Sequence, residues 1–123
     1  MELFEMLDWN QPEPVQKEGR SIARIESDIS QFMQPFSERY NKNVWDNCAM
    51  IVAEKTDLEL EPYLKALLEW TQDLNWPGAL LILNRLKAFS NRHALEETVK
   101  QCLAAAKEQN DEVWKKTLLL VIQ

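Results

Sequence analysis

The fold is decided by the stretch Leu67-Leu68-Glu69-Trp70-Thr71-Gln72-Asp73-Leu74-Asn75-Trp76-Pro77-Gly78-Ala79. Just before and within it, residues are spaced as one buried face of a helix: Leu64, Leu67, Leu68 and Thr71. Pro77 has no backbone N–H to lose in the first turn of a helix, and its ring disfavours helical geometry at Trp76. We therefore expect one helix to end here and another to begin at Pro77. Such a short link predicts that the two helices pack antiparallel as a hairpin.

The run from Leu68 to Pro77 resembles the signature of a bacterial family of small, uncharacterised, HEAT-like all-helical domains. That signature reads Leu-Glu-Trp-x-Gln-Asp-x-Asn-Trp-Pro, with Leu and Met expected where this chain has Thr71 and Leu74. The likeness covers roughly Pro12 to the C-terminus and includes two further segments, Asn43–Ala49 and Asp111–Lys115. The resemblance implies a fold similar to HEAT-type helical repeats. It implies no reaction, because none is assigned to the family.

An internal repeat supports the same fold class. Three residues at positions i, i+4 and i+7 recur in four places: Val15–Gly19–Ile22, Trp45–Ala49–Val52, Trp76–Leu80–Leu83 and Trp114–Leu118–Val121. Their starts lie 30, 31 and 38 residues apart. Helix pairs with such a period are typical of an α-solenoid, so we predict an all-α, HEAT-like solenoid of antiparallel helix pairs with about six to eight helices. A plain helical bundle uses the same amphipathic faces and is the alternative.

The chain of 123 residues is expected to form a single domain, with residues 1–11 as an N-terminal extension that packs on it. In that extension, Leu3, Phe4 and Leu7 predict one helical turn. Further along, helices are expected to begin at polar capping residues. These are Asp28 or Ser30, Asn43, and Asn110 or Asp111.

Charge is distributed unevenly along the chain. Residues 1–73 contain fifteen Asp and Glu against seven Lys and Arg, a net charge of −8, whereas residues 74–123 carry +2. An acidic segment repels nucleic acid and anionic lipid and attracts basic protein surfaces. The alternative is that the acidic residues only keep the protein soluble. The N-terminus has no basic signal-peptide region and the longest apolar run, Leu118–Ile122, is too short to span a bilayer, so we expect a cytoplasmic protein.

The sequence offers no constellation for catalysis, a metal or a cofactor. Cys48 and Cys102 are 54 residues apart and are expected to be buried, reduced thiols, while His93 is the only histidine. Helical-repeat DNA glycosylases need a broad basic surface. The short basic cluster of Arg85, Lys87 and Arg92 has too few charges for the six to ten phosphate contacts common in duplex binders.

The leading hypothesis is a non-catalytic protein-binding module, in concrete form an immunity protein that neutralises a basic toxin such as a nuclease. Asp57, Glu59 and Glu61 are the expected contacts, because they lie together beside a turn between helices. Further candidates come from the deciding stretch, namely Trp70, Asp73 and Trp76. The alternative is a structural or adaptor domain that self-associates through the apolar run Leu118–Ile122, so the chain is expected to be a monomer or a weak homodimer.

Overall fold

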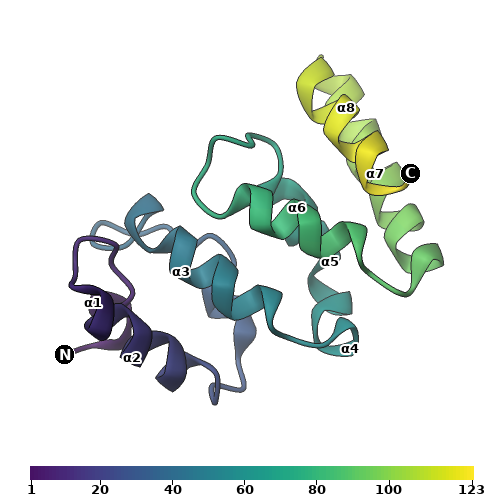
Figure 1. Ribbon diagram of the computed structural model, residues 1–123. Helices are drawn as coiled ribbons and strands as arrows, with labels where there is room; N and C mark the ends of the chain where they lie inside the picture. Colours follow the sequence, from purple (N-terminus) through teal and green to yellow (C-terminus); the bar gives the residue numbers. More distant parts are fainter. The chain divides into compact units, whose positions relative to one another are not determined.

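The computed structural model describes all residues from Met1 to Gln123 and is helical throughout, with no strand. The predicted all-α class is therefore confirmed. The chain forms two compact units, residues 1–54 and residues 55–123, and each is described by itself below (Figure 1). The single domain expected for residues 1–123 stays a prediction. None of the helices combines the length and the apolar character needed to cross a membrane.

The first unit contains three α-helices and one 3₁₀-helix. They are α1 (Leu3–Met6), α2 (Glu13–Ala23), η1 (Ile29–Phe32) and α3 (Lys42–Ala53). Helix α2 packs against both α1 and α3, and η1 covers α3 from another side. The predicted turn at the N-terminus is confirmed, because α1 spans Leu3–Met6 and Leu7 directly after it is buried.

A buried polar network holds the three α-helices of this unit together. Asn47 on α3 donates hydrogen bonds to the Leu7 carbonyl oxygen at 2.7 Å and to Gln16 Oε1 on α2 at 2.9 Å. Arg20 on α2 donates to Asn47 Oδ1, and its other terminal nitrogen lies 2.8 Å from Glu13 Oε1. Because a buried polar group is costly unless it is hydrogen-bonded, this network favours one packing of the helices over others.

The expected cap at Asn43 is wrong by two residues. Helix α3 begins at Lys42 and its N-cap residue is Asn41. Asn43 lies in the first turn, and its Oδ1 accepts a hydrogen bond from the Asn41 N–H at 2.8 Å. The Asn43 side chain therefore binds the N–H group of the residue before the helix, whereas a capping side chain binds N–H groups of the first turn that follows it. At η1, by contrast, Asp28 caps as expected and accepts from the Ser30 N–H at 3.1 Å.

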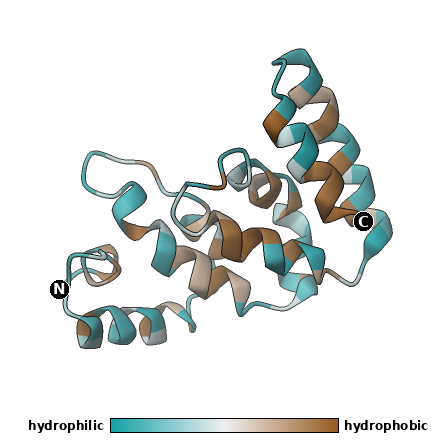
Figure 2. Ribbon diagram, turned by 45° about the horizontal axis from the view of Figure 1, so that its top comes forward, coloured by the Kyte–Doolittle hydropathy of each residue, from teal (hydrophilic) through white to brown (hydrophobic).

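The second unit contains α4 (Asp57–Leu60), η2 (Glu61–Tyr63), α5 (Leu64–Trp70), α6 (Ala79–Lys87), α7 (Arg92–Glu108) and α8 (Glu112–Val121). Helix α5 packs on α6 and α7, and α8 packs on α6 and α7. Figures 1 and 2 both show α7 and α8 side by side. The expected cap of the last helix is confirmed, with Asp111 Oδ1 accepting from the Trp114 N–H at 3.0 Å.

The deciding stretch forms the expected turn, but the second helix begins later than predicted. Helix α6 begins at Ala79, and its N-cap residue Gly78 has a φ of 82°, a left-handed conformation that favours glycine. Pro77 lies in the turn, where its carbonyl oxygen accepts a hydrogen bond from Trp70 Nε1 at 3.0 Å. The buried Trp70 ring therefore holds Pro77 in the turn through this hydrogen bond. The presence of Pro77 in the sequence does not by itself indicate that contact.

The repeat template is correct in two of its four copies. Trp45–Ala49–Val52 and Trp114–Leu118–Val121 are fully buried. The third copy is wrong, because Trp76 precedes α6 and Leu80 is exposed, while the inner face of α6 is Ala79, Ile82, Leu83 and Leu86. In the first copy only Gly19 is buried. The i, i+4, i+7 spacing places three residues on one face of a helix, but packing decides whether that face is buried.

Candidate functional site

The turn that precedes α4 is held by a capping box. Thr56 Oγ1 accepts a hydrogen bond from the Glu59 N–H at 3.2 Å, and Glu59 Oε1 accepts from the Thr56 N–H at 3.2 Å. The bonds that Glu59 Oε1 accepts from the Thr56 N–H and, at 3.0 Å, from the Thr56 hydroxyl group lower the pKa of the Glu59 carboxyl group, because they stabilise its charged form. Glu59 therefore stays ionised at neutral pH while its backbone position is fixed.

Asp57 is held by partners from the turn between α6 and α7. The Ser90 hydroxyl group donates to Asp57 Oδ2 at 2.6 Å, and the Ser90 N–H donates to the same oxygen at 2.8 Å. Arg85 forms an ion pair with Asp57 Oδ1 at 2.5 Å. The bonds from Ser90, followed by Arg85, lower the pKa of Asp57 to about 2. The charge of Asp57 is thus compensated by groups of the same chain and contributes little to the attraction of a partner.

Glu61 makes a similar connection four residues later. Its Oε1 accepts a hydrogen bond from Asn91 Nδ2 at 2.7 Å. Asn91 in turn caps α7, because its Oδ1 accepts from the Ala94 N–H at 3.1 Å. Asp57 and Glu61 therefore both fasten the α4 region to the start of α7. Glu61 remains exposed despite this bond.

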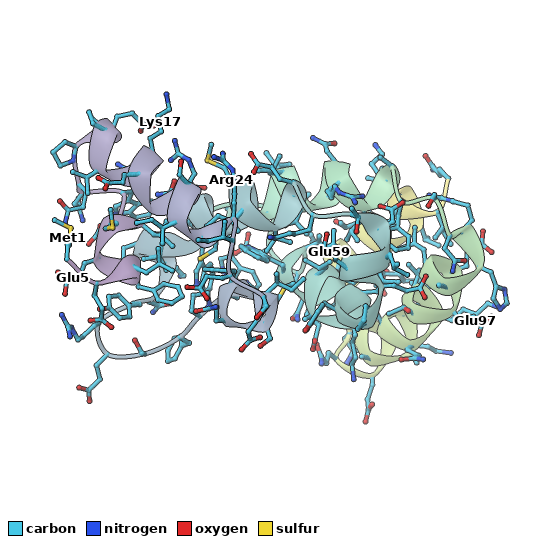
Figure 3. All side chains as sticks on the ribbon, turned by 90° about the horizontal axis from the view of Figure 1, so that it is seen from below. Met1, Glu5, Lys17, Arg24, Glu59 and Glu97 are labelled. Atoms are coloured by element: carbon cyan, nitrogen blue, oxygen red, sulfur yellow. The ribbon has the colours of Figure 1, made fainter.

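An exposed leucine lies between these carboxylates. Leu58, in the first turn of α4, exposes 83% of its surface. Its neighbours Glu59, Glu61 and Pro62 are exposed as well. We call these four residues the α4 surface; Glu59 is labelled in Figure 3. The arrangement is an exposed apolar side chain with the exposed carboxylates Glu59 and Glu61 close by in the chain, on backbone that a capping box and the internal bonds of Asp57 and Glu61 keep in place.

The structure separates the remaining predicted contacts from the α4 surface. Trp70 has no exposed surface and belongs to the core, so it offers nothing to a partner in this conformation. Asp73 is exposed and Trp76 half-buried, and both lie in the turn between α5 and α6. The seven-residue helix α5, about 10 Å long, separates that turn from α4. Of the six predicted residues, Glu59 and Glu61 belong to the α4 surface and Asp57 is bonded within the molecule. Trp70 is in the core, and Asp73 and Trp76 share a separate turn.

The arginines of the basic cluster serve as internal hydrogen-bond donors. Arg85 Nη2 donates to the Lys55 carbonyl oxygen at 2.9 Å, in addition to its ion pair with Asp57. Arg92 Nη2 donates to the Val121 carbonyl oxygen at 3.1 Å, where α8 ends. Cationic side chains at the C-terminal ends of helices bind carbonyl groups that have no partner within the helix.

Both cysteines are buried and free, as the sequence predicts. Burial raises the pKa of the Cys48 thiol to about 12 and, together with the nearby Glu69, the pKa of the Cys102 thiol to about 11. The reactive thiolate form is therefore strongly disfavoured at neutral pH. His93 is exposed in the first turn of α7.

A family model described as a domain of unknown function, DUF5071, matches residues 41–123, two thirds of the chain. The chain belongs to the DUF5071 family. The DUF5071 match includes the stretch Leu68–Pro77 and the whole α4 surface. It begins at residue 41, in contrast to the extent from Pro12 that the resemblance implies. No curated protein and no solved structure matches this DUF5071 chain.

The sequence does not indicate the roles of three residues of the site, namely Leu58, Ser90 and Asn91. Leu58 reads as an ordinary apolar residue of the next helix, and only its position opposite the buried Leu60 could indicate that it faces outward. Ser90 and Asn91 read as a turn, which is correct. Their bonds to Asp57 and Glu61 join residues about 30 positions apart, and nothing in either segment alone signals that contact.

Proposed function

We propose that this DUF5071 chain is a non-catalytic protein-binding module that docks a basic partner on the α4 surface. The observation that carries the proposal is the exposure of Leu58, over 83% of its surface, next to the exposed carboxylates Glu59 and Glu61. Apolar side chains at the centre of an interface contribute most of the binding energy, whereas rim charges raise the association rate. Because the capping box already orders this turn, little conformational entropy is lost when a partner binds.

A helical-repeat scaffold is part of this proposal. In the second unit, α5 packs on α6 and α7 packs on α8, while α5 also packs on α7 and α6 on α8. Such a contact pattern supports two antiparallel helix pairs stacked in register, which is how a HEAT-like solenoid is built. The turns between stacked helices lie at the edge of a solenoid, and α4 leads into the first of these pairs.

One concrete form of the role is a cytoplasmic immunity protein that neutralises a basic toxin such as a nuclease. A toxin must be captured quickly, and opposite charges accelerate association. The net charge of −6 supports a basic partner and opposes binding to nucleic acid or to an anionic membrane. This form rests on analogy of charge and size, and its partner is to be identified by experiment.

The experiment is affinity capture from native lysate with matched variants. Glu59→Gln with Glu61→Gln removes two charges from the α4 surface, while glutamine can still complete a capping box and accept from Asn91. The control, Glu96→Gln with Glu108→Gln, removes two charges from exposed positions on α7. We expect a basic protein that is captured by wild type and by the control and is largely lost from the α4 variant. Equal capture by all three would contradict the assignment.

A second candidate function is a structural or adaptor domain with a homotypic interface. The observation that favours it lies in the terminal apolar run, which is brown at the end of α8 in Figure 2. Leu118 and Val121 are buried, but Leu119 and Leu120 remain partly exposed. Self-association that persists in purified protein would support this function, and the next section assigns the surfaces involved.

A further inference from the structure

Two exposed helix flanks have the same residue spacing and opposite charge. On α2 the residues Val15, Glu18 and Ile22 stand at positions i, i+3 and i+7. On α8 the same positions are occupied by Val113, Lys116 and Leu120. Residues three and four positions apart are neighbours on a helix surface, so each set forms a continuous strip. We call these strips the α2 flank and the α8 flank.

Both flanks lie beside the buried face of their helix and outside it. The buried residues of α2 are Gly19, Arg20 and Ala23, and those of α8 are Trp114, Thr117, Leu118 and Val121. Most of the flank residues are accessible: Ile22 exposes 39% of its surface, Val113 69% and Leu120 40%, while Val15 is half-buried. Glu18 and Lys116 are exposed and form no ion pair within the chain.

We propose that the α2 flank of one copy packs against the α8 flank of a second copy, with the two helices antiparallel. In that register Val15 faces Leu120, Ile22 faces Val113, and Glu18 lies beside Lys116. Two apolar contacts then enclose one ion pair.

Charge selects this pairing over the symmetric ones. Packing two α2 flanks together would bring Glu18 against its own copy, and packing two α8 flanks would do the same with Lys116. Like charges placed opposite each other disfavour both arrangements. The helices as wholes differ less, because α2 carries two acidic and two basic residues whereas α8 carries two lysines and one glutamate, so the selection rests on Glu18 and Lys116 themselves.

The contact is heterologous, since each copy contributes a different surface. Copies joined in this way form a ring if the rotation closes and a chain if it does not. Three residues a side make a small interface, so association should be weak and dependent on concentration. The inference rests on the homotypic function above and is independent of the α4 surface, which none of its variants alters.

The test is sedimentation velocity on the full chain across a wide concentration range. We expect the weight-average mass of wild type to rise with concentration at low salt. The rise should diminish in about 1 M sodium chloride, where the Debye length falls to ~3 Å. Glu18→Lys and Lys116→Glu should each weaken association by at least about tenfold, because each places like charges in the contact. An equimolar mixture of the two variants should associate again, since each then meets a complementary flank.

A matched control is available one residue away. Lys115→Glu makes the same charge change on the same helix but points to its other side, about 100° around the axis. It should associate like wild type. Leu120→Gln, which leaves the charge unaltered, should weaken association. Thermal melts of the three charge variants should match wild type because Glu18, Lys115 and Lys116 are exposed. Leu120→Gln should melt slightly lower, since Leu120 exposes only 40% of its surface.

Three results would overturn the inference. A wild type that stays monomeric throughout rejects it together with the homotypic function. Self-association that neither charge reversal affects rejects the two flanks and leaves the homotypic function standing. If both reversals weaken association but the mixture does not recover, the flanks do not pair with each other.

Discussion

Asp57 shows how a residue chosen as a surface contact can serve the fold. Its two oxygens accept hydrogen bonds from Arg85 and from both the side chain and the backbone of Ser90. Its carboxylate thereby joins the start of α4 to the turn before α7. Reversing this charge would remove partners from two other segments, so it cannot serve as a neutral probe of binding.

This role predicts a pH-dependent loss of stability in Asp57→Asn. The pKa of Asp57 is lowered from 3.8 to about 2 in the folded protein, so its charge stabilises the fold above about pH 4, and this contribution is lost as the pH falls toward 2. The variant should unfold with about 1–2 kcal/mol less free energy at pH 7, after allowance for partial exposure. Urea denaturation should show the two proteins converging near pH 2. A difference that stays constant with pH would contradict the linkage.

The two tryptophans of the deciding stretch should differ in their effect on stability. Trp70 is fully buried and bonded to the Pro77 carbonyl oxygen, whereas Trp76 is half-buried in the turn. Trp70→Ala should therefore cost about 3–5 kcal/mol, and Trp76→Ala at least about 1 kcal/mol less. Chemical denaturation of both variants measures the difference. Equal losses of unfolding free energy in the two variants would show that the partial exposure of Trp76 does not reduce its contribution to stability.

At the scale of elements, local signals were readable from the sequence and distant ones were not. Asp28 and Asp111 cap helices, each one of the candidates that the sequence offers, because a cap needs only N–H groups two or three residues away. The start of α6 was misplaced because it depends on the buried ring of Trp70, seven residues before Pro77. The template assigns Leu80 to the inner face, but residues 79 to 83 are all apolar, so the sequence alone does not show which of them pack on α5 and α8.

The contact between α1 and α2 supplies a test of close packing. A Cβ atom added to Gly19 would lie 2.8 Å from Met6 Cβ and 3.1 Å from Leu7 Cδ2, so α1 would have to move. Alanine is about 1 kcal/mol more favourable than glycine in a helix, yet overpacking costs about 1–3 kcal/mol. Gly19→Ala should therefore be destabilising, while the exposed control Ser21→Ala should not. A thermal melt in which Gly19→Ala gains stability would refute the close approach.

At the scale of the whole molecule, charge predicts that duplex DNA is not a ligand. The net charge of −6 is repulsive, and Arg85 and Arg92 are engaged with carbonyl groups of their own chain. Fluorescence anisotropy with labelled duplex at physiological salt should show no binding. Micromolar binding that weakens steeply as salt is added would revive a glycosylase-like role.

The acidic surface itself was predictable in outline, because Asp57, Glu59 and Glu61 are close in sequence. Its internal bonds were not, since they depend on where α7 begins. These bonds separate two roles within the acidic segment. Asp57 stabilises the folded chain, while Leu58, Glu59 and Glu61 remain exposed to a partner.

The most direct test of the proposed docking site is the binding kinetics of the captured partner, measured with purified proteins. Leu58→Asp should raise the dissociation rate, because the apolar centre of the contact is lost, and its melting temperature should match wild type since Leu58 is exposed. Glu59→Gln with Glu61→Gln should mainly lower the association rate and reduce its dependence on salt. If both variants bind with wild-type rates, the α4 surface is not the docking site.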